Sequence, residues 1–298
     1  MEKKIAIVGM PMSYGQPHPG VALGPDAVRH AGLTERLRQL GLAPEDMGNM
    51  EIGTGERTVD PETGMKNLHQ VAEACEQLAA QVDRLFGQNF FPLVLGGDHS
   101  MAIGTIAGAA KHFRNPGILW IDAHGDLNTP ETSPSGNIHG MPLAASLGLG
   151  AEPLINLYGS APKISFENIV LIGIRDLDEG EKRLIRERKI KAYTMHEIDR
   201  DGMKRVMEEA IAYLRERADG VHLSFDLDSL DPSEAPGVGT PVKGGLTFRE
   251  ARLAMEMLGE SGLIASCEFV EVNPLLDTKN QTAGRAVDLI SALFERMR

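Results

Sequence analysis

Short apolar runs rich in β-branched residues alternate along this chain with longer segments whose apolar residues recur at helical spacing. This alternation is typical of a mostly parallel sheet with helices packed on both faces. Strands are expected at residues 5–9, 92–95, 117–121, 169–174, 191–194, 221–226 and 264–270. Helices are expected at residues 25–40, 66–86, 101–112, 179–188, 202–217, 248–259 and 284–297. The predicted fold class is therefore α/β, a three-layer α/β/α arrangement around a mostly parallel central sheet, as a single domain over residues 1–298.

Composition and charge narrow the class of protein further. The 298 residues are 42% hydrophobic and 24% charged, which is ordinary for a globular protein. The formal net charge of −12 disfavours nucleic acid and anionic membranes as partners. The 2 cysteines form no Cys-x-x-Cys pair, which argues against a disulfide scaffold or a thiolate zinc site. No apolar run approaches the roughly 20 residues of a membrane span, so we expect a cytoplasmic protein.

Three acid-rich patches follow three of the predicted strands. The chain reads GGDHS at 96–100, DAHGD at 122–126 and DLD at 226–228. In an extended segment residues two apart share a face, so the acidic and histidine side chains of each patch are expected to point the same way. Together they supply two histidines and four aspartates at one edge of the sheet. The candidate metal ligands are His99, Asp122, His124, Asp126, Asp226 and Asp228.

Charge arithmetic favours two divalent cations at this edge. Four ionised aspartates would be neutralised by two such ions, and without metal the carboxylates would raise one another's pKa. Carboxylate and imidazole ligands without thiolate favour Mn²⁺, with Co²⁺, Fe²⁺ or Zn²⁺ as alternatives. A site of this kind activates a hydroxide for attack on carbon or phosphorus, so ligand spacing alone leaves the substrate open. His139, in the loop that follows the second patch, is a candidate proton donor, the alternative being a surface histidine.

Two loops rich in Gly, Pro, Ser and Thr break the alternation at residues 128–137 and 232–245. Each directly follows a metal-type patch. Loops at the carboxyl ends of parallel strands are where open α/β sheets bind ligands, so these two loops are expected to shape the substrate site.

Several motifs in order resemble the ureohydrolase (arginase/agmatinase) family: GGDHS, DAHGD, SGNIHG, SFDLDSLDP and EFVEVNP. The similarity runs nearly end to end and includes VGMPMSYGQPHPG and GPDAVR near the start. Within the family the chain is most similar to bacterial arginases. The resemblance implies manganese-dependent hydrolysis of L-arginine to L-ornithine and urea by a metal-bridging hydroxide, with Co²⁺ as a substitute metal.

The resemblance also assigns roles residue by residue. It implies two Mn²⁺ per subunit, one bound by His99, Asp122, Asp126 and Asp226, the other by His124, Asp122, Asp226 and Asp228. His139 matches the family's proton shuttle, Glu271 the carboxylate that receives the guanidinium, and Asp126 is counted among the catalytic residues as a ligand. Asp98 and Asp231, beside the ligands, are expected to orient them.

The substrate end follows in the same way. Asn128, Ser135 and Asn137 match positions that bind the α-carboxylate of arginine, and the α-amino side is matched by Asp176, Asp178 and Glu181. The partners implied are L-arginine and other copies of the chain, in a homo-oligomer that the family suggests is a hexamer. Two alternatives stay open: a sister ureohydrolase acting on agmatine, guanidinobutyrate or formimidoylglutamate, and a non-catalytic metal-binding scaffold on the same fold.

Overall fold

The computed structural model describes residues 4–53 and 55–297, and its centre is one eight-stranded sheet in which every pair of neighbours is parallel. The strand order is β2-β1-β3-β8-β7-β4-β5-β6. The predicted α/β fold with a mostly parallel sheet is confirmed. The strands are β1 (Lys4–Met10), β2 (Glu45–Asn49), β3 (Phe90–Gly96), β4 (Pro116–Ile121), β5 (Ile169–Ile174), β6 (Lys191–Thr194), β7 (Gly220–Asp226) and β8 (Ile264–Val270).

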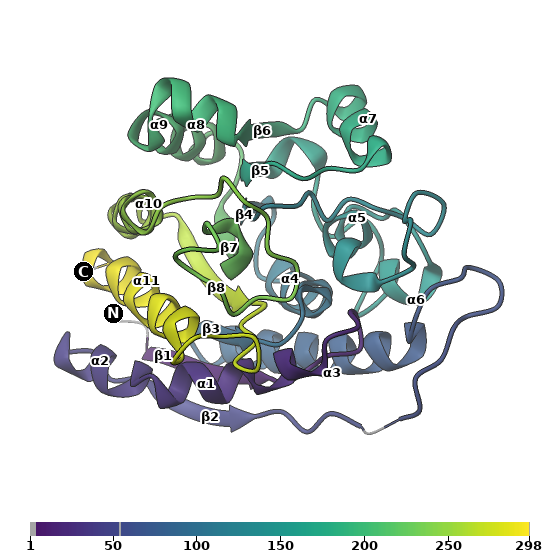
Figure 1. The fold of residues 1–298 in the computed structure, drawn as a ribbon, viewed down its shortest axis with the longest axis horizontal. Coiled ribbons are helices and arrows are strands. Elements are labelled where there is room, and N and C mark those ends of the chain that lie inside the picture. The colour runs from purple at the N-terminus through teal and green to yellow at the C-terminus, as the bar shows by residue number, and fades with distance from the viewer. Residues whose placement is uncertain (1–3, 54, 298) are drawn as a thin grey trace.

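Helices cover both faces of the sheet and complete the three layers (Figure 1). On one face lie α1 (Gly24–His30), α2 (Leu33–Gln39), α8 (Met195–Asp201), α9 (Met203–Arg215), α10 (Phe248–Ser261) and α11 (Gln281–Arg296). On the other lie α3 (Leu68–Gly87), α4 (Ala102–Ala110), α5 (Pro142–Ser146), α6 (Glu152–Ile155) and α7 (Glu179–Arg188). Short 3-10 turns are η1 (Pro19–Leu23), η2 (His99–Met101), η3 (Ile138–Gly140), η4 (Phe166–Asn168) and η5 (Leu227–Ser229).

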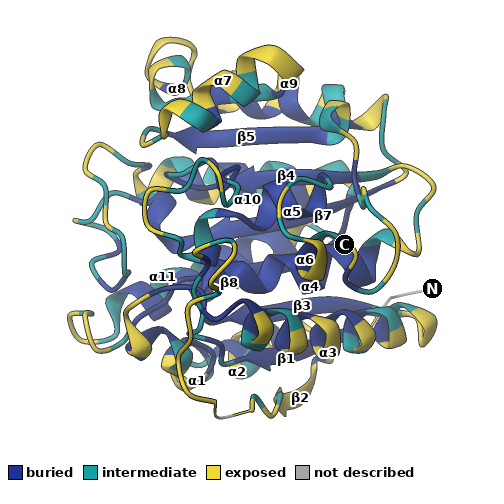
Figure 2. Ribbon diagram, turned by 90° about the vertical axis from the view of Figure 1, so that its right-hand side faces the viewer, coloured by how far each residue is buried: buried dark blue, intermediate teal, exposed yellow. Residues whose placement is uncertain are grey.

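The central strands are buried along their whole length because helices cover them from both sides. All residues of β5, β7 and β8 are buried, as the dark strands at the middle of Figure 2 show. Phe225 and Phe269 stack across β7 and β8 with ring centroids 5.3 Å apart. This rigid core fixes the strand ends from which the polar loops leave. Among the described residues, no helix combines the length and the apolar character needed to cross a membrane.

The structure corrects the prediction of one helix over residues 25–40. Two helices stand there, α1 and α2, separated at Gly32, whose φ of 95° is incompatible with a continuous helix. Val28, Leu33 and Leu37 are all buried in the same core, which explains why their spacing looked like one helical face. The edge strand β2 was not predicted, because its five residues, EDMGN, are all exposed and carry no apolar alternation.

Candidate functional site

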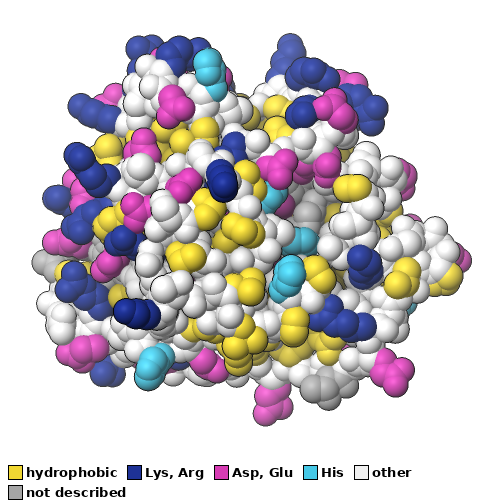
Figure 3. Space-filling model, viewed as in Figure 1, with side chains coloured by type: hydrophobic (Ala, Val, Ile, Leu, Met, Phe, Trp, Pro, Cys, Tyr) yellow, Lys and Arg dark blue, Asp and Glu magenta, His cyan; other side chains and the backbone are white. Residues whose placement is uncertain are grey.

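The polar site lies at the carboxyl edge of four adjacent strands, β3, β8, β7 and β4. The GGDHS patch leaves β3, the DAHGD patch leaves β4, and the DLD patch begins at the last residue of β7. Figure 3 shows histidine and acidic side chains gathered near the middle of the face on which these loops lie. The sheet order therefore brings together segments more than a hundred residues apart in sequence.

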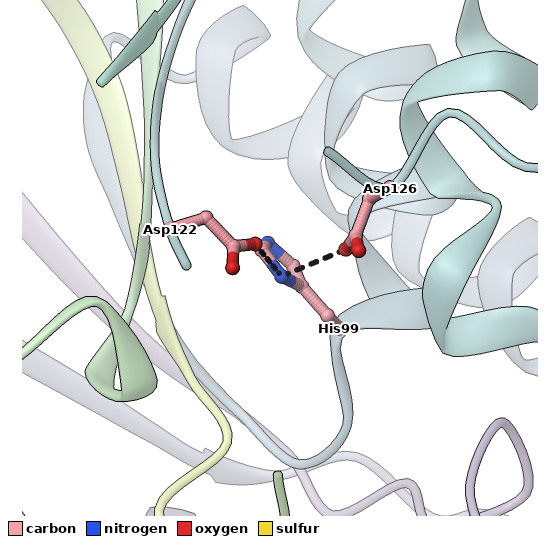
Figure 4. A group of neighbouring side chains, drawn as sticks. All are labelled: His99, Asp122 and Asp126. Atoms are coloured by element: carbon pink, nitrogen blue, oxygen red, sulfur yellow. Dashed lines mark ion pairs between the residues drawn. The ribbon is translucent and has the colours of Figure 1, made fainter. Parts of the chain in front are cut away.

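One side of the site is centred on His99, which begins η2 (Figure 4). Its Nδ1 atom lies 3.1 Å from an oxygen of Asp122, 3.2 Å from one of Asp126 and 3.1 Å from one of Asp226. All four side chains are at most 7% exposed. Three carboxylates thus converge on a single buried imidazole nitrogen.

The other side is centred on His124 in the loop after β4. Its Nδ1 atom lies 3.4 Å from Oδ1 of Asp122 and 3.2 Å from Oδ2 of Asp228. Its Nε2 atom lies 3.9 Å from Asp176, whose side chain is 65% exposed. Asp122 contributes one oxygen to each side, so the two clusters share this carboxylate.

The predicted orientation of the patches needs one correction. Extended alternation would place Asp122, His124 and Asp126 on one face, but the chain leaves the strand at Asp122 and Asp126 adopts a left-handed φ of 52°. Asp126 therefore faces His99 while His124 faces the other cluster. Asp226 and Asp228 divide in the same way, because η5 begins between them.

Burial of these carboxylates beside one another and beside histidines shifts their pKa values. Burial and the neighbouring charge of Asp122 raise the pKa of Asp126 to about 6. Burial, Asp228 and Asp122 raise the pKa of Asp226 well above its usual range. Burial alone would lower the pKa of His99, but the three carboxylates around it reverse that effect and raise the pKa well above normal. At neutral pH these directions favour a protonated His99 imidazole among its carboxylate neighbours.

The donor set fits divalent cations. His99 Nδ1 is fully buried and makes no hydrogen bond of normal geometry within the part of the chain that the structure describes, yet it faces three carboxylate oxygens. Two groups of side chains, His99 with Asp122 and Asp126, and Asp122 with His124 and Asp228, present ligand atoms within 4.8 Å of one another. Imidazole and carboxylate donors without thiolate suit a cation such as Mn²⁺, and a cation would replace the protons that the carboxylates otherwise keep.

A buried hydrogen-bond chain holds His99 in the orientation that ligation requires. His99 Nε2 lies 2.7 Å from the Ser224 hydroxyl, which donates to Glu268 Oε1 at 2.7 Å. Because the Ser224 proton goes to Glu268, the serine oxygen accepts from Nε2–H, and the Nδ1 lone pair is left for a cation. Trp120 stacks on the ring at 4.1 Å and donates to Asp122 Oδ2 at 2.9 Å.

These supporting residues were missed by the sequence analysis, although a signal for them exists. His222, Ser224 and Asp226 alternate along buried β7, and Ser266 and Glu268 alternate along β8. Polar residues two apart in a buried strand indicate a polar seam on one face of the sheet.

The hydrogen bonds that Asp98 and Asp231 make within the described chain do not reach a candidate ligand side chain, although Asp98 is the N-cap of η2, the turn that begins with His99. Asp98 accepts from the backbone N–H of Gly15 at 2.9 Å and of Ser100 at 3.0 Å, and so fastens the opening loop to the turn after β3. Asp231 accepts from residues 233, 244 and 245 and closes the 232–245 loop on itself. The residue of that loop that reaches a candidate ligand is Thr240, whose hydroxyl donates to Asp228 Oδ2 at 2.9 Å.

His139 and Glu271 lie together beside the His99 cluster. His139 Nδ1 is 3.5 Å from Glu271 Oε1, which also accepts the backbone N–H of His99 at 2.8 Å. Glu271 has a left-handed φ of 65° and is 1% exposed, and Gln16 Nε2 approaches its other oxygen at 3.3 Å. Burial lowers the pKa of His139, but the Glu271 carboxylate outweighs it, so the pKa is raised overall.

The predicted substrate residues line one pocket that opens over the candidate ligands. The pocket has about 660 Å³ of empty space, part of it open to solvent. All six of these residues line it: Asn128, Ser135, Asn137, Asp176, Asp178 and Glu181. His139, both candidate ligand histidines and Thr240 share the lining. Glu271 and Asp122 lie behind that surface rather than in it.

Two sides of this pocket are joined directly. Asn128 Nδ2 donates to Asp178 Oδ2 at 2.8 Å, and the Thr132 hydroxyl donates to the side-chain oxygen Oδ1 of Asn128 at 2.9 Å. Asp178 is the N-cap of α7, and Glu181 completes its capping box. The capping box therefore places an exposed carboxylate beside an amide at a fixed separation.

Comparison with known proteins agrees with the resemblance read from the motifs. The model of the arginase family matches residues 3–295. The arginase of Bacillus caldovelox is 62% identical across 98% of each chain, and its solved structure superposes with a TM-score of 0.96. The arginase of Bacillus subtilis (strain 168) is 58% identical over 99% of this chain and 98% of its own. The arginase of Entamoeba histolytica, solved in complex with L-ornithine, is 33% identical over 98% of each chain with a TM-score of 0.91. The chain therefore belongs to the arginase family.

Proposed function

We propose that this enzyme hydrolyses L-arginine to L-ornithine and urea with two Mn²⁺ ions bound at the clustered ligands. The observation that carries the proposal is a single pocket with the two ligand clusters at its base and the Asn128–Asp178 pair in its wall. The ligand clusters suit a pair of cations that activate water for attack on a poor electrophile. The Asn128–Asp178 pair suits the α-carboxylate and α-amino groups of an amino acid. L-Ornithine, present in the Entamoeba histolytica structure, is the product proposed here.

The Asn128–Asp178 pair supports an α-amino acid as substrate. The carboxylate and ammonium of an amino acid are bonded to the same carbon, so their binding groups must be close together. The amide of Asn128 and the carboxylate of Asp178 are 2.8 Å apart, one able to donate and the other to accept. A substrate without a carboxylate, such as agmatine, would leave the amide side unused.

The reacting end uses the deeper residues. Two divalent cations held by the clustered ligands would lower the pKa of a water molecule and stabilise the negative charge of the oxygen that attacks the guanidinium carbon. Glu271 is proposed to pair with the guanidinium and fix its plane, and it lies 3.5 Å from His139, which lines the pocket. His139, held by Glu271, is proposed to give a proton to the leaving amine.

Metal identity and assembly are part of the same proposal. Mixed carboxylate and imidazole donors favour Mn²⁺, and Co²⁺ is the proposed substitute. The resemblance suggests a homo-oligomer, a hexamer in bacterial relatives.

The test is urea release from L-arginine and from agmatine after the metal-free protein has been loaded with Mn²⁺, Co²⁺ or Zn²⁺ in turn. We expect turnover of arginine, highest with Mn²⁺ or Co²⁺, and little turnover of agmatine. Efficient agmatine turnover without arginine turnover would replace the proposal with a sister ureohydrolase. Tight binding of two cations with no turnover of any guanidino compound would instead indicate a metal-binding scaffold.

A further inference from the structure

The pocket poses an electrostatic problem for the proposed substrate. Its lining includes six carboxylates and, among the described lining residues, no lysine or arginine. Bound cations would offset the charge of the candidate ligands Asp126, Asp226 and Asp228, which leaves the acidic groups of Asp176, Asp178 and Glu181. An amino acid substrate carries a carboxylate, which these acidic groups repel, whereas agmatine is doubly cationic and is attracted. Selectivity for arginine therefore needs a positive charge near the carboxylate end of the pocket, and the inference below rests on the proposed function.

Lys66 is the cation placed there. Its Nζ atom donates to Asn137 Oδ1 at 3.0 Å, and Asn137 lines the pocket. The backbone N–H of Lys66 donates to Gly136 O at 2.9 Å, and Lys66 also forms an antiparallel bridge with Val59. Lys66 is thus bonded to two successive residues of the 128–137 loop, to Gly136 through its backbone and to Asn137 through its side chain.

The segment that carries Lys66 packs closely against the 128–137 loop. Gly136 has a left-handed φ of 70°, and a Cβ there would lie 2.5 Å from the carbonyl oxygen of Gly64. The chain that precedes α3 therefore lies directly against the 128–137 loop. A change of the Lys66 side chain removes the charge while this backbone contact remains.

The contact also fixes which end of the Asn137 amide meets the pocket. A lysine ammonium has only donors, so the amide must present its oxygen to Lys66. The NH₂ group then points away from the lysine. In the part of the chain that the structure describes, no acceptor bonded to that NH₂ group is found, and it stays available to an anion.

We propose that Lys66 is a specificity-determining residue. It turns the Asn137 amide so that its NH₂ group can bind the substrate carboxylate, and it supplies the charge that offsets the acidic lining. Lys66 does not take part in the hydrolytic step, so it acts on binding of carboxylate-bearing molecules and leaves turnover nearly unchanged.

The test compares Lys66→Met and Lys66→Arg with the wild-type enzyme loaded with Mn²⁺. Lys204→Met is the matched control, since Lys204 is an exposed lysine on α9 paired with Glu208. In Lys66→Met we expect the KM for arginine and the inhibition constant of L-ornithine to rise about tenfold, as for loss of a charge-assisted contact, with kcat within about twofold. The inhibition constant of putrescine, which is ornithine without its carboxylate, should stay within about twofold. Lys66→Arg should retain most of the ornithine affinity, and Lys204→Met should match wild type.

Equal weakening of ornithine and putrescine, or a fall in kcat with KM unchanged, would overturn the inference and indicate a role in supporting the loop. Unchanged ornithine binding in Lys66→Met would overturn it as well. Metal content and circular dichroism of each variant separate these results from misfolding. If the wild-type enzyme released no urea from arginine, the proposed function would fail, whereas an unaltered preference in an active Lys66→Met enzyme would refute only the role of Lys66.

Discussion

Replacement of Thr240 by valine should weaken one of the two cation sites and spare the other. The Thr240 hydroxyl donates to Asp228 Oδ2 at 2.9 Å, the same oxygen that lies 3.2 Å from His124 Nδ1. Among the described residues, the other oxygen of Asp228 has one long hydrogen bond, 3.4 Å from the backbone nitrogen of Ala123. Thr240 is thus the main hydrogen bond that orients this buried carboxylate, and valine has nearly the same shape without the donor.

The expected magnitude follows from the charge of the acceptor. A hydrogen bond to a charged group contributes about 1.5–3 kcal/mol, and each 1.4 kcal/mol is about a factor of ten in affinity. Loss of residues that orient ligands typically costs about 10- to 100-fold in metal affinity, which agrees with that range. We therefore expect the cation on the His124 side to bind about 10- to 100-fold more weakly in Thr240→Val. The cation beside His99 should be unaffected, because Thr240 makes no hydrogen bond to that cluster in the described chain.

The assay is calorimetric titration of metal-free protein with Mn²⁺, in which two binding steps are resolved. Thr240→Ser keeps the hydroxyl and is the control. Thr240 lies partly exposed in a loop, so the thermal midpoint of the metal-free protein should change little. The reasoning would be refuted by equal weakening of both steps, or by wild-type affinities in Thr240→Val.

Four further measurements test other parts of the site. Loading Mn²⁺ at pH 7.5 should release about one proton per chain or more, because the raised pKa of His99 keeps its imidazole protonated until a cation binds. Calorimetry in buffers of different ionisation enthalpy would measure the number of protons released. Metal affinity should fall as pH drops through about 6, where Asp126 takes up its proton; a flat profile would contradict the pKa direction. His139→Ala should lower kcat about 10²- to 10⁴-fold with full metal content by atomic absorption, and unchanged turnover would remove it as proton donor. Asp178→Ala should reduce the preference for arginine over its des-amino analogue, as measured by the ratio of kcat/KM values.

Burial explains part of what the sequence predicted of the fold. Strands β5, β6 and β8 have the predicted bounds, and β5 and β8 are continuous buried runs. By contrast β2 is wholly exposed; it pairs with β1 at the edge of the sheet, and the Arg29 guanidinium also binds Asp46 at 2.9 Å. The five residues of β2 show no apolar alternation, so their sequence could not predict a strand at this position.

At the site, the strand ends predicted which residues gather, but their division into two clusters could not be read from the motifs. That division depends on the left-handed backbone at Asp126 and on the turn that begins at Leu227. A left-handed φ is uncommon outside glycine even though aspartate adopts it more often than most residues, so the motif alone does not specify it. The partners of His99 could have been predicted, because Ser224 and Glu268 are polar residues within two buried strands.

Glu181 joins two of the loops around the pocket, and we expect this link to affect the length of substrate that the pocket accepts. The resemblance makes it a substrate contact, yet both of its oxygens already accept backbone N–H groups, Leu127 at 3.0 Å and Asp178 at 2.8 Å. Burial nevertheless raises its pKa to about 7 in spite of those two donors. The close approach requires Gly125, where a Cβ would lie 2.9 Å from Glu181 Oε1. Glu181 is therefore a strut between the loop that carries Asp126 and the cap that carries Asp178. The separation of the candidate ligand Asp126 from the Asp178 carboxylate depends on this strut, so we expect Gly125 in the DAHGD motif to affect the substrate length that the proposed site accepts.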